Sequence, residues 1–80
     1  MENYDDITQL HFQHVLRRFR LEAGLTQEQL SEKIGVSPGF YSMMEIGRKW
    51  PNINMLFRIA EALGKRPGEL VDALEKESKK

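Results

Sequence analysis

Two histidines near the N-terminus have a spacing that could support metal chemistry. His11 and His14 form an H-x-x-H pair, and residues three positions apart on a helix lie on the same face. Imidazoles on one face can share a metal ion, but a zinc site normally needs further ligands. No acidic residue or third ligand is placed to complete such a site. We therefore interpret both as surface histidines and predict no metal and no other cofactor.

The chain also lacks the residue sets on which enzyme active sites depend. No combination of Ser, His and Asp suggests an activated nucleophile, and no glycine-rich loop is present to hold a phosphate. We therefore predict that this protein is not an enzyme.

A different kind of chemistry is indicated by the stretch VSPGFYSMMEIGRKW, residues 36–50. Its pattern predicts a helix whose outer positions carry few hydrogen-bond donors. A serine hydroxyl both donates and accepts, so the two serines among them could bond a polar partner only permissively. The outer positions are Ser37, Pro38, Gly39, Phe40, Ser42 and Met43.

The spacing of apolar residues predicts that this stretch is the third of five helices joined by short loops, with no strands. The first helix ends at Gly24, a left-handed cap. The second begins after Thr26, whose hydroxyl can form a capping box with Gln29. The apolar stripe of the first helix consists of Phe12, Val15, Leu16, Phe19 and Ala23.

The second and third helices, joined by a tight glycine turn, form a helix-turn-helix over residues 27–46. Gly35 supplies the positive φ that the sharp turn needs. Ser37 is expected to cap the third helix, with Pro38 at its first position. Ser31 is small where the two helices must approach closely. Their crossing is expected to depend on Leu30, Val36, Tyr41 and Met44.

Two more helices follow the helix-turn-helix. Asn52 is the expected N-cap of the fourth, which stops at Gly64, and Pro67 begins the fifth. The buried stripe predicted for the fourth helix consists of Ile53, Leu56, Ile59, Ala60 and Leu63. The fifth carries Leu70, Val71 and Leu74 on one side. These three are expected in the core, but any part left exposed, together with Phe57, would form a two-fold dimer patch.

Composition describes a small domain without covalent cross-links. The chain has 80 residues, no cysteine and a net charge of zero, from 12 basic and 12 acidic side chains. The lack of cysteine excludes disulfides and thiolate metal sites, and fits a reducing cytosol. No apolar run is long enough to span a bilayer, and the acidic N-terminus is not a signal peptide. We predict a flexible acidic arm over residues 1–6, a helix-turn-helix domain over 7–74 and a charged tail over 75–80.

The distribution of charge is more informative than its sum. A net charge of zero counts mildly against nucleic acid, since phosphate neutralisation supplies much of the affinity. The acidic residues Glu2, Asp5 and Asp6 lie in the arm, however, and the remainder of the chain is net positive. Its basic groups include Arg17, Arg18, Arg20, Arg48 and Lys49.

Several segments in this order carry a resemblance to a known family. They are LRRFRLEAGLTQEQLSEKIGVS, the E-x-G of MEIGR, PNINMLFRIAEALG and RPGELV, and together they span most of the chain. With them the chain resembles the Cro/C1-type (XRE-type) helix-turn-helix regulators. The resemblance implies an all-α, compact five-helix bundle of the lambda-repressor-like kind that binds double-stranded DNA. It further implies a cytoplasmic regulator, prokaryotic or phage-encoded, of repressor or controller type, acting as a homodimer and without a membrane contact.

The same resemblance implies roles for single residues. Gln27 matches the glutamine that holds a phosphate at the start of the second helix; a solvated surface glutamine is the alternative. Glu45 matches the acid of the E-x-G element, whose arginine partner on the first helix is Arg20 here. Arg48 and Lys49 match the position at which members of the family bind the DNA backbone. The alternative is that they are two solvated loop cations.

Trp50 departs from the family, which usually has a polar residue at this position. Its indole could pack on the loop, touch sugar and phosphate, or join an interface. We favour packing, because tryptophan buries a large area and needs only one partner for its N–H.

In the family, bases are read from the first two turns of the third helix, which here lack the Arg, Lys, Asn or Gln forks of direct readout. Three interpretations follow. Phe40 and Met43 read thymine methyls, with Gly39 allowing close approach and DNA shape supplying the rest. Or DNA binding is weak, and dimerisation or a protein partner supplies specificity. Or the face serves a protein contact, for which exposed Phe and Met are suited. Phe40 could also fold back on the domain.

Overall fold

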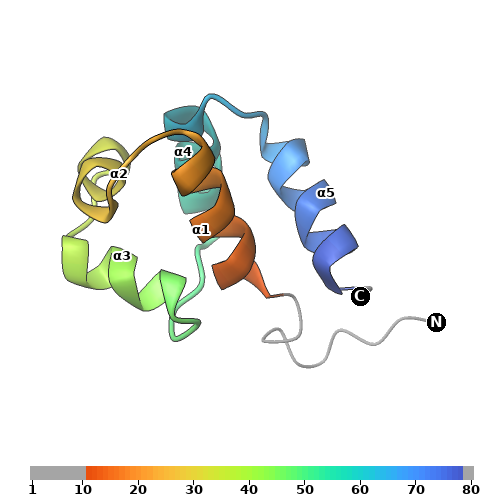
Figure 1. Ribbon diagram of the computed structural model, residues 1–80, viewed down its shortest axis with the longest axis horizontal. Coiled ribbons are helices and arrows are strands. Elements are labelled where there is room, and N and C mark those ends of the chain that lie inside the picture. The colour runs from red at the N-terminus through yellow and green to blue at the C-terminus, as the bar shows by residue number, and fades with distance from the viewer. Residues whose placement is uncertain (1–10, 79–80) are drawn as a thin grey trace.

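The computed structural model describes residues 11–78, with residue 78 described by its backbone alone. Between these limits the chain forms helices and no strand, as the sequence predicts (Figure 1). The predicted acidic arm lies outside the described residues. The helices are α1 (Phe12–Glu22), α2 (Gln27–Ile34), α3 (Pro38–Glu45), α4 (Ile53–Leu63) and α5 (Pro67–Ser78).

The helix ends form where the local sequence predicts them. Thr26 Oγ1 accepts the N–H of Gln29 at 3.0 Å, and the Gln29 side chain accepts the N–H of Thr26 at 2.9 Å, which completes the capping box. Ser37 and Asn52 cap α3 and α4 by accepting main-chain N–H groups at 3.1 and 2.8 Å. Gly35 ends α2 with a φ of 79°, a left-handed conformation that a Cβ would strain. These ends fix the lengths of the short helices.

The helices are arranged around α1, which packs against α3 on one side and α5 on the other. The fourth helix contacts both α2 and α5, and so closes the bundle. Figure 1 shows α2 and α3 together at one end of the molecule, with α5 at the other. The helix-turn-helix is therefore supported from behind by α1 and α4.

The core draws on every helix. It corrects the predicted stripes at two positions: Ala23 is exposed as the C-cap of α1, and Ile53, predicted to be buried, is 69% exposed. Both lie at a helix end, where neighbouring helices do not cover them. The residues buried completely are Val15, Leu16, Leu30, Tyr41, Met44, Ile59, Ala60 and Leu70.

The last helix is longer than the sequence suggests. It continues to Ser78, whereas a charged tail was predicted from residue 75. Arg66 N–H donates to Glu69 Oε1 at 2.8 Å at its start, where the first N–H groups of a helix need acceptors. Among the described residues, no helix is long and apolar enough to cross a membrane.

Candidate nucleic-acid interface

A buried ion pair ties the end of α3 to α1. Arg20 Nε donates to Glu45 Oε2 at 2.6 Å, and its Nη2 donates to Oε1 at 3.1 Å. The third guanidinium nitrogen, Nη1, donates to the carbonyl of Leu25 at 2.9 Å. The arginine fork thus holds both carboxylate oxygens, an arrangement stronger and more directional than a single contact. The pair that the resemblance implies is present, and it fixes where α3 ends.

Two more side chains complete the environment of this carboxylate. Gln27 Nε2 donates to Glu45 Oε1 at 2.9 Å, and the Tyr41 hydroxyl donates to Oε2. Burial alone would raise the pKa of Glu45, but the hydrogen bonds from Arg20, Tyr41 and Gln27 outweigh it and lower the pKa below the ordinary carboxyl value. Burial and the bond to Glu45 raise the pKa of Tyr41, which therefore stays protonated. One carboxylate thereby joins α1, α2 and α3.

The angle between α2 and α3 is set by the turn at Gly35. Val36 N–H donates back to the Ser31 carbonyl at 3.0 Å, so the chain reverses immediately after α2. Ser31 is buried and its hydroxyl donates to the carbonyl of Glu28 at 2.8 Å, which satisfies the small polar side chain inside the contact. This matches its predicted place where the two helices approach.

The outer face of α3 is open and mostly apolar. Pro38 and Gly39 are exposed, and a Cβ built on Gly39 would meet nothing closer than Ser37 Oγ, at 4.0 Å. Met43 is 37% exposed and Ile46 is 62% exposed. Ser37 is exposed as the cap, while Phe40 and Ser42 are half-buried. The described face therefore offers apolar contact and room for close approach, with little hydrogen bonding.

Two interpretations of Phe40 were possible: contact with thymine, or folding back on the domain. Its observed position is intermediate between them. It packs against the buried core and is only half-buried. Part of the ring therefore supports α3 from behind, and part is left for an external contact. Met43 is the more accessible of the two residues that were predicted to contact thymine.

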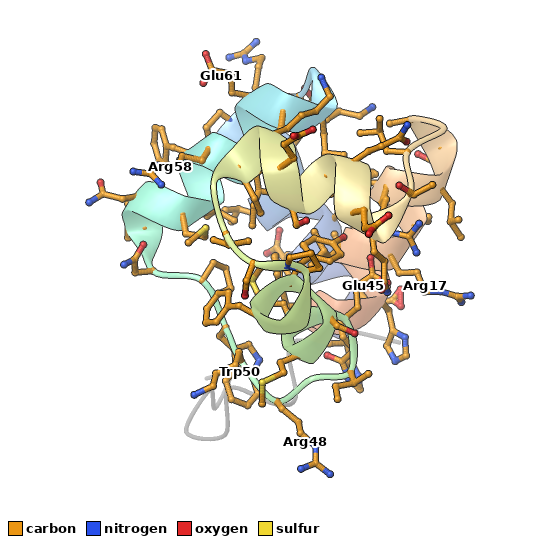
Figure 2. The ribbon with its side chains drawn as sticks, turned by 90° about the vertical axis from the view of Figure 1, so that its left-hand side faces the viewer. Arg17, Glu45, Arg48, Trp50, Arg58 and Glu61 are labelled. Carbon is orange, nitrogen blue, oxygen red and sulfur yellow. The ribbon has the colours of Figure 1, made fainter. Side chains whose placement is uncertain are left out.

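The basic loop after α3 is anchored by its backbone. Met43 carbonyl accepts the N–H of Arg48 at 2.8 Å and that of Lys49 at 3.2 Å. Gly47 turns the chain with a φ of 82°, and the Gln13 side chain lies 3.1 Å from where a Cβ would be. Both cationic side chains are exposed, and Figure 2 shows Arg48 directed away from the body of the molecule. A backbone held by hydrogen bonds thus presents two exposed cations beside α3.

Trp50 packs against the core, as expected from its sequence position. It is half-buried and lies against the core cluster. Its Nε1 is buried and has no hydrogen-bond partner among the described residues. Trp50 therefore holds the loop in place by the apolar packing of its indole ring, and its N–H makes no hydrogen bond to the described residues that would add to this.

The two histidines lie at the start of α1 and contact each other. Their rings stack with centroids 5.5 Å apart, and His11 has a left-handed φ of 56° at the N-cap. Within the described residues, no group of three or more His, Cys, Asp or Glu side chains is placed to hold a metal ion.

Sequence reasoning missed the hydrogen bonds of Gln27 and Tyr41 to Glu45 and the exposure of Ile46. The contact between Gln27 and Glu45 joins residues 18 positions apart, which no local pattern reports. The exposure of Ile46 was also missed, although its place one turn after Ser42 could have indicated it. Gln27 was expected to face a phosphate alone; it is half-buried and one of its two amide N–H groups is already bonded.

Two short helices crossed at a glycine turn, with the second one fixed by a buried ion pair and open on its outer side, define the helix-turn-helix class of DNA-binding domain. The chain belongs to the helix-turn-helix family of the Cro/C1 (XRE) type: the model of this family, described as helix-turn-helix, matches residues 16–70.

Similar proteins carry the same description. The chain is 38% identical over 66 residues to an uncharacterized HTH-type transcriptional regulator of Methanothermobacter thermautotrophicus, covering 82% of this chain and 96% of the relative. It is 43% identical over 54 residues to the HTH-type transcriptional regulator y4dJ of Sinorhizobium fredii, covering 68% and 70% of the two chains.

Two solved structures are similar across the whole bundle. The clp gene regulator ClgR of Corynebacterium glutamicum superposes with a TM-score of 0.85 at 28% identity, covering 94% of this chain and 80% of that one. A mutant of the restriction-modification controller protein C.Esp1396I superposes with a TM-score of 0.83 at 27% identity, covering 94% of this chain and all of that one.

Proposed function

We propose that this protein is a transcription regulator that binds double-stranded operator DNA as a homodimer, with α3 in the major groove. The observation that carries the proposal is the two-sidedness of α3. Its inner side is fixed by Arg20 and Glu45, and its outer side is open. A recognition helix needs both properties, because it must keep its position while its outer residues touch base edges. Relatives named as HTH-type transcriptional regulators support the same function. Such a regulator acts in the cytoplasm, on the nucleoid, and is not an enzyme.

The proposed backbone contacts flank α3 on two sides. Gln27 is the first residue of α2, where main-chain N–H groups lack intrahelical acceptors and can bind a phosphate. Glu45 holds one N–H of the Gln27 amide, which orients the second N–H for the same phosphate. Arg48 and Lys49 supply positive charge on the other side. These contacts position the protein without reading sequence.

Base recognition is proposed to rest on apolar contact and on DNA shape. The exposed thioether of Met43 can contact thymine methyl groups, and Gly39 lets the helix approach the groove closely. The half-buried Phe40 adds the exposed part of its ring. Sequence-dependent groove width and bending then supply specificity that no hydrogen bond provides.

A second function is favoured by one observation on the same face. Met43 and Ile46 are both exposed, and adjoining apolar side chains are suited to a protein partner. In that case the fold would serve as a protein-interaction module whose DNA binding is weak or lost. The two functions differ in the salt dependence of DNA binding.

The proposal is tested by selecting, from a random library, the DNA duplexes that the purified protein binds at near-physiological salt. We expect an inverted repeat with thymine-rich half-sites whose centres are about 10 base pairs apart, one helical turn. The logarithm of the association constant should fall with log salt at a slope of about −0.9 for each phosphate contacted. Recovery of no motif, with shallow salt dependence and a partner that masks Met43, would favour the interaction module.

A matched pair of variants tests the backbone contacts. Lys49→Ala should weaken binding to all DNA sequences similarly and make the salt slope shallower by about 0.9 if one contact is lost. Lys76→Ala makes the same change in net charge on α5, away from α3, and should leave the slope unchanged. Arg48→Ala should add to the effect of Lys49→Ala. Equal effects of Lys49→Ala and Lys76→Ala would mean that only net charge matters.

A further inference from the structure

The loop after α3 carries two cations that the described chain leaves unpaired. Arg48 and Lys49 are exposed, and neither has a carboxylate partner among residues 11–78. The acid nearest to them in the sequence, Glu45, is buried and held by Arg20. The chain has no other acidic residue before Glu61. Two neighbouring cations without a counter-charge attract any anion that can reach the loop.

The start of α1 lies against this loop. Phe12, the first residue of α1, is buried in the core. The side chain of Gln13 lies against Gly47, with Nε2 3.1 Å from where a Cβ of that glycine would be, and Gly47 directly precedes Arg48. Figure 1 shows the first turn of α1 and the loop after α3 at the same, lower edge of the molecule. The chain therefore enters the domain beside its basic loop.

The sequence that leads to this point is acidic. Glu2, Asp5 and Asp6 lie in the acidic arm, residues 1–6, and the first ten residues contain no lysine or arginine. The five residues from Asp6 to His11 can span up to about 17 Å when extended. Both cations of the loop lie within that reach, because the loop touches the start of α1.

We propose that the acidic arm docks on Arg48 and Lys49 and competes with DNA phosphate for them. The inference rests on the proposed function, in which the same two cations contact the DNA backbone. Arginine and lysine bind carboxylates and phosphates through the same charge-assisted hydrogen bonds, so one occupant excludes the other. Because the carboxylates belong to the same chain, they compete at an effective concentration of about millimolar.

Such a contact sets the strength of DNA binding and leaves its sequence preference unchanged. Contacts to the DNA backbone carry no sequence information, so a competitor for them lowers the affinity for all duplexes similarly. Exposed ion pairs are weak, and DNA can therefore displace the arm. The arm itself is repelled by phosphate, which favours the loop over DNA as its binding surface.

The first test removes the charge of the arm in the full chain. The variant carries Glu2→Gln, Asp5→Asn and Asp6→Asn together, and its affinity for a mixed-sequence DNA duplex is compared with that of the wild type at low salt. We expect affinity to rise by about two- to thirtyfold, the effect of losing two exposed ion pairs. The gain should shrink at high salt, which screens exposed charges.

A matched control makes the same change in net charge elsewhere. It carries Glu22→Gln, Glu61→Gln and Asp72→Asn, three exposed positions on α1, α4 and α5. We expect it to raise the affinity much less than the arm variant does. In a chain that already carries Arg48→Ala and Lys49→Ala, removing the charge of the arm should give no gain, because the cations are gone. Circular dichroism checks that every variant is folded.

The second test detects the contact without DNA. A carbodiimide joins a carboxyl group to a lysine amine that lies beside it, and mass spectrometry locates the amide in the monomeric product. We expect amides between the arm and Lys49, and few to Lys33 on α2 or to Lys65 after α4. Addition of the duplex should suppress the product at Lys49.

The outcomes separate the inference from the proposed function. The inference is overturned by an arm variant whose affinity equals that of the wild type or of the control, or by a gain that persists without Arg48 and Lys49. Amides spread evenly over Lys33, Lys49 and Lys65 also overturn it. If DNA binds but neither the gain nor the amide at Lys49 is found, the inference alone is wrong. If the amide forms but no variant binds DNA, the proposed function is wrong and the docking of the arm stands.

Discussion

The two sides of α3 differ in their chemistry. The inner side meets a carboxylate that accepts hydrogen bonds from Arg20, Gln27 and Tyr41. The outer side carries Met43 and Ile46 in water, with hardly any donor. Polar chemistry is used to hold this helix in place, and apolar contact is left for what the helix touches. The contrast implies that stability and recognition depend on separate residues.

The largest effect is expected when the ion pair on the inner side of α3 is removed. Arg20→Ala leaves the buried carboxylate of Glu45 without its cation, which should reduce the free energy of unfolding by about 3–5 kcal/mol. Urea denaturation followed by circular dichroism measures the loss. Arg17→Ala is the matched control, since Arg17 is exposed on the same helix, and should stay within about 0.5 kcal/mol of wild type. Similar losses in the two variants would show that the ion pair contributes no more to the free energy of unfolding than an exposed arginine does.

A fall in pH should gradually remove the stabilisation that ionised Glu45 gives on the inner side of α3. The pKa of Glu45 is lowered in the folded chain, so its ionised form stabilises the fold above the unfolded carboxyl value, about 4.3. That contribution is lost as pH falls through the lower folded pKa. Unfolding free energies measured from neutral to acidic pH should therefore converge for wild type and Glu45→Gln. A gap that stays constant with pH would mean that the charge of Glu45 contributes nothing.

A substitution at Gly39 should change stability and DNA affinity in opposite directions, which sharpens the contrast between the two sides of α3. A Cβ at this position has open space around it, and alanine favours a helix over glycine, so Gly39→Ala should stabilise the fold by up to about 0.5–1 kcal/mol. The added methyl should lower DNA affinity if the backbone approaches the groove closely. Thermal melting and titration with the selected duplex measure the two effects. Unchanged affinity in the more stable variant would argue against close approach at Gly39.

The smallest effect on stability is expected at Met43. Met43→Ala removes an exposed side chain and should change the unfolding free energy by no more than about 0.5 kcal/mol. The motif recovered from a duplex library should change, with weaker preference for thymine at one position of each half-site. If the recovered motif is identical to that of the wild type, direct readout by Met43 is wrong.

Local features of the fold could be predicted from the sequence because they depend on neighbouring residues. The caps at Thr26, Ser37 and Asn52 and the turn at Gly35 involve contacts within a few positions. A short polar side chain before an apolar run identifies such ends reliably. All of them were found where they were predicted.

Burial at helix ends could not be predicted in the same way. Ile53 has the right phase for the buried stripe of α4, yet it is largely exposed. Periodicity tells which face a residue occupies, but the packed neighbours decide how far along the helix that face is covered. Val71, left open between core and patch, is 50% exposed although it lies inside α5.

The candidate site was predictable in part. The pairing of Arg20 with Glu45 came from the family resemblance, because the two residues are 25 positions apart. The bonds from Gln27 and Tyr41 to the same carboxylate were not anticipated, since they depend on the crossing of three helices. The roles of Gln27, Arg48, Lys49 and the outer residues of α3 toward DNA stay predictions.

Because α3 is anchored from behind, its outer residues can be exchanged one at a time while the domain stays folded. Mutational paths between different binding preferences then need not pass through unfolded intermediates. Under the proposed function, a lineage that carries this domain can drift toward new target sites by single substitutions at positions such as Gly39 and Met43, with Arg20 and Glu45 held constant.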